Sequence, residues 1–503
     1  MKKRVLALII AVFLIFACCG CNDTTVTTET ESWVEGGDST VTTDGSGQKD
    51  ANNDGSNNNG GSNNNGGGNT TITEPMKVNL NGATITIYDA SSQFSTDTSN
   101  KTKKSYADIL ASVQKSLNCK FKVTVVDDGK LKSLVISSAA SGKALSNIIC
   151  PDMSAAGSYI AAGVVADLTR VSSMDLSQEY MNRLNMLNAS ALGGAKYAVT
   201  SENGVRTWAT FYNKRILKEM GYSENYLYDL VDSKKWNYAT VRELGKKAMK
   251  DIDGKSGMSN DDQWGFLWVD NSMMTSHAIA NSGGSLIKHN KDNYLEYNMT
   301  DSRVISSINL INEFYREGTS CLGISNYLDR ISAFTKGHSL FLFSNIHHSP
   351  TISSNMTDDF GVLPIPMVEG ASDYKTALDW NAGVMMIPAG LSAKDQYNSG
   401  AVIQAILSQC EKNVAVMKDE YINRYFCDDE SGKNMVLAIE QVMANVEAFY
   451  CNSNEQLLSG TYRPMWNLLD GKISSVVTEI DSTKNTTVKA IEELNARAKK
   501  NKS

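Results

Sequence analysis

Four residues that could bind a small polar ligand come directly after short strand-like runs in this sequence. Asp89, Gln93 and Phe94 follow one such run, and Asp152 follows another. A carboxylate or an amide hydrogen-bonds hydroxyl groups, and a phenyl ring covers an apolar face. Open α/β sheets bind ligands beyond the carboxyl ends of their strands. We therefore expect these four residues to contact a ligand, with a solvated loop as the alternative.

The apolar residues around these positions repeat with two different periods. Segment 84–88 alternates with period two, segment 106–117 repeats at helical spacing, and segment 121–125 alternates again. Strand, helix and strand in this order form the βαβ unit of a mostly parallel sheet. Further helical stripes occur at 240–249 and 304–314. These periods predict an α/β fold throughout the body of the chain.

Length, charge and cysteine spacing limit the organisation and the partners of the chain. About 425 residues follow the polar N-terminal region, which is more than one ordinary core holds, so we expect two lobes. The formal net charge of −7 argues against nucleic acid as a partner and against a polybasic contact with a membrane. Six cysteines lie in the body without a C-x-x-C pair. Scattered thiols or a Cys427–Cys451 disulfide both fit this spacing.

The N-terminus has the composition of an export signal. A basic start precedes an unbroken apolar run that is too short to span a bilayer. The residues before Cys18 resemble the lipobox of bacterial lipoproteins, in which the cysteine becomes the lipidated N-terminus. We predict a signal peptide at 1–17 and lipidation of Cys18, with Cys19, Cys21 or an ordinary signal peptide as alternatives. Lipidation would hold the chain on the outer face of the bacterial cytoplasmic membrane.

Residues 18–75 are predicted to be a lipidated N-terminus followed by a disordered linker. After the cysteines, this segment consists mostly of Thr, Ser, Asn, Gly and Asp. It has too little apolar surface to offset the entropy lost on ordering. At roughly 5–6 Å × √n, some fifty flexible residues have a reach of about 40 Å.

Seven short segments of the body carry a resemblance to a known family. In chain order they are 211–214 (Phe-Tyr-Asn-Lys), Trp236, 263–266 (Gln-Trp-Gly-Phe), 282–284, 314–318, 333–337 and 363–366 (Leu-Pro-Ile-Pro). In their order and spacing, these segments are similar to the family 1 extracellular solute-binding proteins of ABC importers, the group that includes maltose-binding protein. The resemblance covers roughly residues 83–500.

The resemblance implies a type II periplasmic-binding-protein-like fold, in which the chain crosses a hinge near residues 200, 385 and 450. One lobe would comprise 76–199 plus about 388–450, and the other about 200–387 plus 451–503. Proteins of this family capture a solute, most often a sugar or an oligosaccharide, between closing lobes and deliver it to a membrane permease. We expect a monomeric binding protein that is not an enzyme, with no catalytic residue, no cofactor and no metal.

The resemblance also selects aromatic candidates for ligand contact. Trp466 lies where the family places a stacking aromatic, and Trp268 and Asp270 lie in a loop where family members place cleft residues. Trp380 comes directly before a presumed hinge strand, and Trp208 lies close to another crossing. For each tryptophan the alternative is a position in the core.

Asn345 and His347 are further predicted ligand contacts, at a point where the sequence departs from the family pattern. Some relatives carry a stacking aromatic near the position of His347, which His348 follows here. Adjacent histidines on a strand-like segment point to opposite sides. We therefore expect hydrogen-bonding or exposed imidazoles and no shared metal ion.

Three other functions fit the same pattern. They are a surface glycan-binding or adhesin-like protein without a permease, an importer component for a solute other than sugar, and a secreted hydrolase. No G-x-S-x-G, Walker loop or H-E-x-x-H motif is present. The acidic run that begins at Asp251 lacks the glycine and the glutamate of an EF-hand, so we expect a polar turn there.

Overall fold

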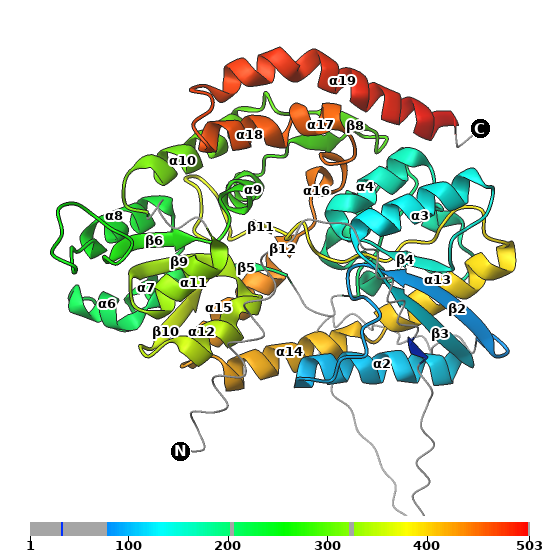
Figure 1. Ribbon diagram of the computed structural model, residues 1–503, viewed down its shortest axis with the longest axis horizontal. Helices are drawn as coiled ribbons and strands as arrows, with labels where there is room; N and C mark the ends of the chain where they lie inside the picture. Colours follow the sequence, from blue (N-terminus) through cyan, green and yellow to red (C-terminus); the bar gives the residue numbers. More distant parts are fainter. Residues whose placement is uncertain (1–31, 34–77, 202–205, 321–325, 501–503) are drawn as a thin grey trace, which may run out of the picture.

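Two α/β lobes lie side by side in the computed structural model, which describes residues 32–33, 78–201, 206–320 and 326–500 (Figure 1). Each lobe is built on a four-stranded sheet. A third group of helices lies across the top of both lobes in Figure 1. The predicted two-lobed α/β fold is confirmed.

The first lobe contains a mostly parallel sheet with the strand order β1-β3-β2-β4. Its strands are β2 (Ala83–Asp89), β3 (Cys119–Val125) and β4 (Ile148–Cys150), with the short β1 (Ser32–Trp33) antiparallel to β3. Its helices are α2 (Lys101–Leu117), α3 (Asp128–Ala140), α4 (Met153–Ala162), α5 (Met186–Ala189) and α13 (Ala393–Leu407), with the 3-10 turns η2 (Leu168–Arg170) and η3 (Glu179–Asn185). Strand β1 lies inside the segment predicted to be a disordered linker, so these two residues depart from that expectation.

Strand β2 and helix α2 form where the apolar periods predict them. Ile85 and Ile87 are buried on one face of β2, and Ile109 and Val113 are buried along one stripe of α2. The side chain of Asn100 accepts a hydrogen bond from the backbone N–H of the third residue of α2, which satisfies one free donor at the start of this helix.

The second lobe contains a mixed sheet with the order β10-β5-β9-β6. Its strands are β5 (Trp208–Asn213), β6 (Trp264–Trp268), β9 (Ser339–Asn345) and β10 (Phe360–Leu363). Strand β9 is parallel to β6 and antiparallel to β5. Surrounding helices are α6 (Lys214–Glu219), α7 (Tyr226–Asp232), α8 (Tyr238–Ala248), α11 (Tyr327–Thr335), α12 (Ser349–Asn355) and α15 (Asp429–Glu440), with the 3-10 turn η4 (Ile346–His348). Almost every residue of these strands is buried, as expected for a sheet covered on both faces.

The group across the top joins segments that are far apart in the sequence. It contains α9 (Asn271–Asn281), α10 (Ser302–Arg316), the hairpin β7 (Ile287–His289) and β8 (Leu295–Tyr297), α16 (Val446–Tyr450), α17 (Glu455–Ser459), α18 (Tyr462–Leu469) and α19 (Val476–Lys500). Helix α19 packs against β8, α10, α17 and α18. Near its end, Arg497 Nη1 donates a hydrogen bond to the carbonyl oxygen of Ala161 at the end of α4. The helix therefore links the top group to the first lobe (Figure 1).

Two connecting segments link the lobes. The described part of the first comprises residues 199–201 and 206–207, which precede β5, and the second leads from β11 (Thr376–Ala377) to residues that bridge β4. In the second segment, Met386 pairs with Ile149, and Met385 pairs with Val199 of the first segment. The two segments are therefore tied to each other and to the first sheet.

A third connection lies between two consecutive helices. Helix α14 (Cys410–Arg424) packs on α2 of the first lobe, whereas α15 packs on β10 of the second. The sequence-based boundaries placed residues up to about 450 in the first lobe, but the packing places α15 with the second sheet. After α15, β12 (Val442–Met443) pairs with β11, and α16 then packs on α4.

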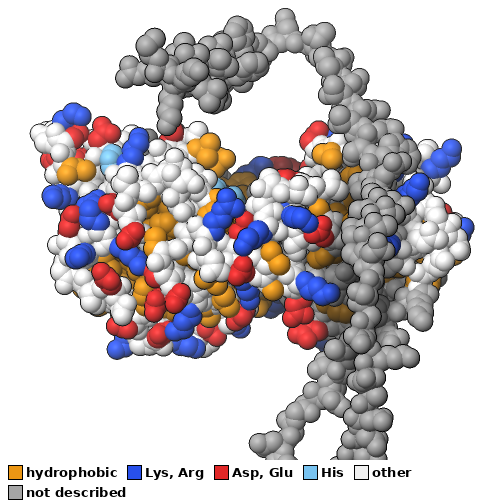
Figure 2. All heavy atoms as spheres, turned by 90° about the horizontal axis from the view of Figure 1, so that it is seen from below, with side chains coloured by type: hydrophobic (Ala, Val, Ile, Leu, Met, Phe, Trp, Pro, Cys, Tyr) orange, Lys and Arg blue, Asp and Glu red, His pale blue; other side chains and the backbone are white. Residues whose placement is uncertain are grey.

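The surface charges, the apolarity of the helices and the cysteine thiols can be compared with the sequence-based expectations. Acidic and basic side chains are interspersed on the face seen in Figure 2, which lies at the bottom of Figure 1. Over the described ranges, no helix is both long enough and apolar enough to cross a bilayer.

Cys427 and Cys451 are free thiols, so the predicted alternative of a disulfide between them is wrong. The predicted signal peptide at 1–17, the lipidation site Cys18 and nearly all of the linker lie outside the described residues.

Candidate functional site

Asp89 shapes the loop that follows β2. Its Oδ1 accepts hydrogen bonds from the backbone N–H groups of Ser91 and Gln93, and its Oδ2 accepts one from Phe94 N at 2.7 Å. Burial raises the pKa of this carboxyl, against the lowering effect of the backbone donors. Phe94 is 2% exposed and packs edge-on against Phe121. Both predicted ligand residues therefore organise the loop and the core in this structure.

Gln93 joins this loop to the first connecting segment. Its Oε1 accepts hydrogen bonds from Ser201 Oγ at 2.7 Å and from Ser201 N at 3.2 Å. The second connecting segment approaches equally closely, because a Cβ placed on Gly383 would lie 2.5 Å from Gln93 Nε2. Gln93 thus lies where both connecting segments meet the first lobe.

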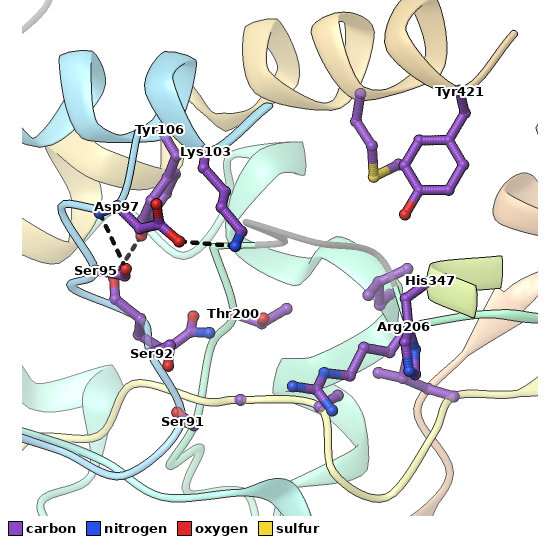
Figure 3. Close-up of a pocket in the computed structure, with 16 residues that line it drawn as sticks. Ser91, Ser92, Ser95, Asp97, Lys103, Tyr106, Thr200, Arg206, His347 and Tyr421 are labelled. Carbon is purple, nitrogen blue, oxygen red and sulfur yellow. Dashed lines mark hydrogen bonds and ion pairs between the residues drawn. The ribbon is translucent and has the colours of Figure 1, made fainter. Parts of the chain in front are cut away.

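A cavity of about 380 Å³ opens at this meeting point (Figure 3). Both lobes, the connecting segments and α14 contribute to its wall, which includes Gln93, Lys103, Thr200, Arg206, His347, Gly383 and Tyr421. The volume falls at the lower end of the range of small-molecule sites. The structure thus brings two of the sequence-predicted residues, Gln93 and His347, to one cavity.

The polar groups of the cavity come from opposite walls. Lys103 Nζ pairs with Asp97 Oδ2 at 2.7 Å on the side of the first lobe. Arg206 and His347 point inward from the side of the second lobe, and the hydroxyl of Tyr421 points inward from α14 (Figure 3). A ligand held there would touch donors from both lobes.

The two adjacent histidines do not point to opposite sides. His347 and His348 lie in η4, a turn of 3-10 helix, and their ring centroids are 4.0 Å apart. The expectation of opposite orientations is wrong because the strand β9 ends at Asn345. Desolvation lowers the pKa of both imidazoles to about 4, with the charge of Arg206 adding to the effect at His347. Both rings are therefore neutral at pH 7.

Asp152 forms a carboxyl pair with Asp128. The backbone N–H of Asp152 donates to Asp128 Oδ1 at 3.2 Å, and the two side chains are also hydrogen-bonded. Desolvation, followed by the charge of Asp128, raises the pKa of Asp152 to about 7, while Arg206 acts in the opposite direction. The two carboxyl groups therefore share a proton over much of the acidic range.

Trp208, Asn345 and Asp379 form a buried network between the second sheet and the second connecting segment. Asp379 Oδ2 accepts hydrogen bonds from Trp208 Nε1 at 3.0 Å and from Asn345 Nδ2 at 2.9 Å. Trp208 is 3% exposed and Asn345 is 1% exposed. Neither predicted ligand residue faces the cavity. Both fix the position of a connecting segment relative to the sheet.

Trp268 and Asp270 also have structural surroundings. Trp268 is 1% exposed and stacks on Tyr315, with ring centroids 5.0 Å apart. Asp270 Oδ1 accepts hydrogen bonds from the backbone N–H groups of Ser272 and Met273, so it caps the start of α9. Burial raises the pKa of Asp270.

Trp380 and Trp466 belong to a partly exposed aromatic group. The rings of Tyr462 and Trp466 are parallel, with centroids 5.8 Å apart, and Trp380 meets Tyr462 edge-on at 6.3 Å. The carbonyl oxygen of Trp380 accepts a hydrogen bond from Ser154 N at the start of α4. This group therefore lies between the top helices and the first lobe, next to the carboxyl pair of Asp152.

Several residues of this region were not predicted from the sequence. Arg206, Tyr421 and Asp379 supply charged and hydrogen-bonding groups here, but none lies in a recognisable motif. Tyr462 had a signal, because it is four residues before Trp466 and such residues share one face of a helix.

Three carboxylates in the loop before β6 also lie close together. The groups of Asp251, Asp253 and Asp262 are within 4.8 Å of one another. Asp262 Oδ1 accepts backbone hydrogen bonds from Ile252 and Asp253, which holds the loop in a tight turn. These hydrogen bonds account for the position of Asp262.

Solved structures with the same fold are ABC substrate-binding proteins and related sugar-binding proteins. One, from Listeria monocytogenes in complex with cycloalternan, is 15% identical with a TM-score of 0.54, over 82% of this chain and 99% of that chain. The cyclic α-maltosyl-1,6-maltose binding protein from Arthrobacter globiformis is 12% identical with a TM-score of 0.58, over 82% and 100%. A cyclo/maltodextrin-binding protein complexed with maltotetraose is 12% identical with a TM-score of 0.56, over 81% and 97%.

These similarities define the class of fold. Because nearly the whole of each neighbour is covered, the chain contains the complete two-lobed architecture of solute-binding proteins. No model of a protein family matches the sequence, and neither does any curated protein sequence.

Proposed function

We propose that this protein is the solute-binding component of an ABC importer and that its solute is a carbohydrate. The observation that carries the proposal is the cavity of about 380 Å³ between the lobes, where both connecting segments meet polar groups from both lobes. A ligand that contacts both lobes favours the closed arrangement over the open one. The solved structures that share the fold include complexes with oligosaccharides.

The partly exposed aromatic group supports a sugar as the ligand. Trp380 and Trp466 are partly exposed, and the buried ring of Tyr462 packs against both of them. Sugars have both apolar faces and hydroxyl rims, so they bind where planar rings and polar groups occur together. The proposed mechanism is capture, closure and presentation to a permease, without cofactor, metal or chemical change of the solute.

The geometry of the acidic residues favours binding over hydrolysis. Glycosidases place their two carboxyl groups about 5 Å apart or more, on either side of the scissile bond. Asp128 and Asp152 are instead direct neighbours, and Asp152 N donates a hydrogen bond to Asp128 Oδ1 at 3.2 Å. We therefore propose a binding protein and not a secreted hydrolase.

A thermal-shift series over mono- and oligosaccharides tests the carbohydrate proposal. A sugar that binds only the folded protein raises the unfolding midpoint in a concentration-dependent manner. A shift with peptides or polyamines and none with sugars would identify an importer component for another solute. Deletion of the adjoining permease genes separates an importer from an adhesin-like glycan-binding protein. Growth on the bound sugar should be lost if the protein serves an importer, and it should be unchanged if the protein only binds glycans.

We also propose that the chain is a monomer tethered through lipid on Cys18 to the outer face of the cytoplasmic membrane. The support is the lipobox-like sequence and the polar segment that follows it. Mass spectrometry of the mature N-terminus identifies the modified cysteine. Release of the Cys18→Ala protein into the medium is the expected result, and retention of that variant on the membrane would point to Cys19 or Cys21.

A further inference from the structure

The cavity between the lobes contains a positively charged side chain that pairs with none of the described residues. Arg206 is half-buried and points into the cavity from the first connecting segment (Figure 3). Within the described residues, its guanidinium group forms no hydrogen bond and no ion pair. A guanidinium carries five N–H donors in a planar fork whose geometry matches a carboxylate.

The ionisable groups near Arg206 that the structure describes form no ion pair with it. Lys103 and Asp97 compensate each other through their ion pair at 2.7 Å. His347 is neutral at pH 7, since desolvation and the charge of Arg206 lower its pKa to about 4. The charge of Arg206 lowers the pKa of Asp152, but these two residues form no ion pair. Among the described residues that line the cavity, Arg206 therefore has no directly paired acid and lies beside a neutral imidazole.

A second free donor faces the cavity from another element. The hydroxyl of Tyr421 points inward from α14, on the wall across from Arg206 (Figure 3). It forms no hydrogen bond with any described residue. Burial raises the pKa of this phenol, so the group is an O–H donor at neutral pH.

We propose that the solute is an acidic carbohydrate, a uronic acid or an oligosaccharide that contains one. Its carboxylate accepts a bidentate pair of hydrogen bonds from Arg206 and a further hydrogen bond from the Tyr421 hydroxyl. If the lobes closed on a neutral sugar, Arg206 would be buried with only hydroxyl oxygens as hydrogen-bond acceptors. The positive charge of its guanidinium group would then be poorly compensated. This inference rests on the proposed function and narrows it to one substrate class.

The experiment compares matched sugars that differ only in oxidation at C6. Glucose, galactose and their trisaccharides are titrated beside glucuronate, galacturonate and the corresponding oligouronides by calorimetry, on the full mature chain. We expect at least one uronide to bind about tenfold or more tightly than its neutral counterpart, as for charge-assisted bidentate pairs. Arg206→Gln should lower affinity for that uronide by about 10- to 100-fold, Arg206→Lys less, and Tyr421→Phe by severalfold.

A matched variant controls for the loss of one positive charge. Arg303→Gln removes an exposed arginine of α10 that pairs with Asp301, and it should leave uronide affinity unchanged. Unfolding midpoints of all variants show whether each is folded.

The possible results separate this inference from the proposed function. Tighter binding of neutral sugars, or equal weakening of neutral and acidic sugars by Arg206→Gln, would overturn the inference and leave carbohydrate binding intact. The second pattern would mean that Arg206 acts within the protein, for example by pairing with Asp152 on closure. Binding of no sugar from either series would refute the carbohydrate function and this inference with it.

Discussion

The indole N–H of Trp208 donates a hydrogen bond to Asp379 Oδ2 at 3.0 Å, across 171 positions of sequence. Trp208 begins β5, directly after the first connecting segment, and Asp379 lies in the second. The bond therefore fixes the spacing of the two segments at the edge of the second sheet. Since Asp379 is 6% exposed, its charge depends on these donors for compensation.

A double-mutant cycle measures this bond. Trp208→Phe and Asp379→Asn should each lower the free energy of unfolding, with a coupling energy of about 1.5 to 3 kcal/mol, the range for hydrogen bonds to charged groups. Denaturant unfolding of the two single variants and the double variant gives the coupling. Additive effects within about 0.5 kcal/mol would show that the bond does not hold the segments.

Trp466 and Trp268 should respond to truncation in different ways. Trp268→Ala leaves a large hole in the core and should lower stability by about 3 to 5 kcal/mol. Trp466 is only partly buried, so Trp466→Ala should cost less stability but weaken sugar binding by about tenfold or more, because the stacking surface is lost. Unfolding and titration of both variants check this contrast. Unchanged sugar affinity of Trp466→Ala would remove this residue from the site.

Gly383 should not tolerate a side chain. An added Cβ would lie 2.5 Å from Gln93 Nε2 and 2.6 Å from Ser91 Oγ. Gly383→Ala should therefore push the second connecting segment away from the first lobe, with a stability loss of about 1 to 3 kcal/mol. Gly129→Ala in α3 is the control, because alanine favours the helix and only Asp127 Oδ1 lies close, at 3.2 Å. If Gly383→Ala left the free energy of unfolding unchanged, the second connecting segment would be able to shift without cost.

Glu447 should make stability fall as pH rises. This carboxyl of α16 is 2% exposed, and burial raises its pKa from 4.5 to about 7. The folded protein then holds a proton that the unfolded chain has lost between these two values. The stability that depends on this carboxyl is therefore fully present below about pH 4.5. It is lost as the pH rises to about 7, and the free energy of unfolding falls by on the order of 3 kcal/mol.

Urea unfolding at pH 5 and pH 8 isolates this contribution. Glu447→Gln should become more stable relative to the unmodified protein at pH 8 than at pH 5. The exposed Glu455→Gln is the control, since the pKa of Glu455 is lowered by Arg463 and its contribution has the opposite sign. An equal stability difference at both pH values for Glu447→Gln would contradict the expected proton uptake.

The sequence was sufficient for the elements and for the class of fold. The period of Ile85 and Ile87 and the helical stripe through Ile109 and Val113 predict β2 and α2, because burial on one face leaves a repeat in the chain. The position of α15 was not predictable in this way. Its apolar stripe is equally compatible with either sheet, and only the tertiary fold places it on β10.

The site was harder to predict than the fold. Asp89 lies at the carboxyl end of β2 as expected, yet its oxygens are occupied by the backbone of its own loop. Trp268 and Trp208 illustrate the same limit, since a tryptophan has the same signal in a core as in a cleft. Arg206 could not be predicted as a site residue, because its proposed role depends on its position in the cavity and on the lack of an ion pair with any described residue.

The length of helix α19 would make a rotation between the lobes measurable. Its 25 residues span about 37 Å at 1.5 Å per residue. It packs against α10 and α18, while Arg497, near its end, contacts the end of α4. If the helix moves with the top group, a rotation of that group by about 10° relative to the first lobe displaces a point at this distance by roughly 6 Å. A pair of spectroscopic labels at the far end of α19 and on α4 would therefore report a rotation too small to resolve inside the cavity itself.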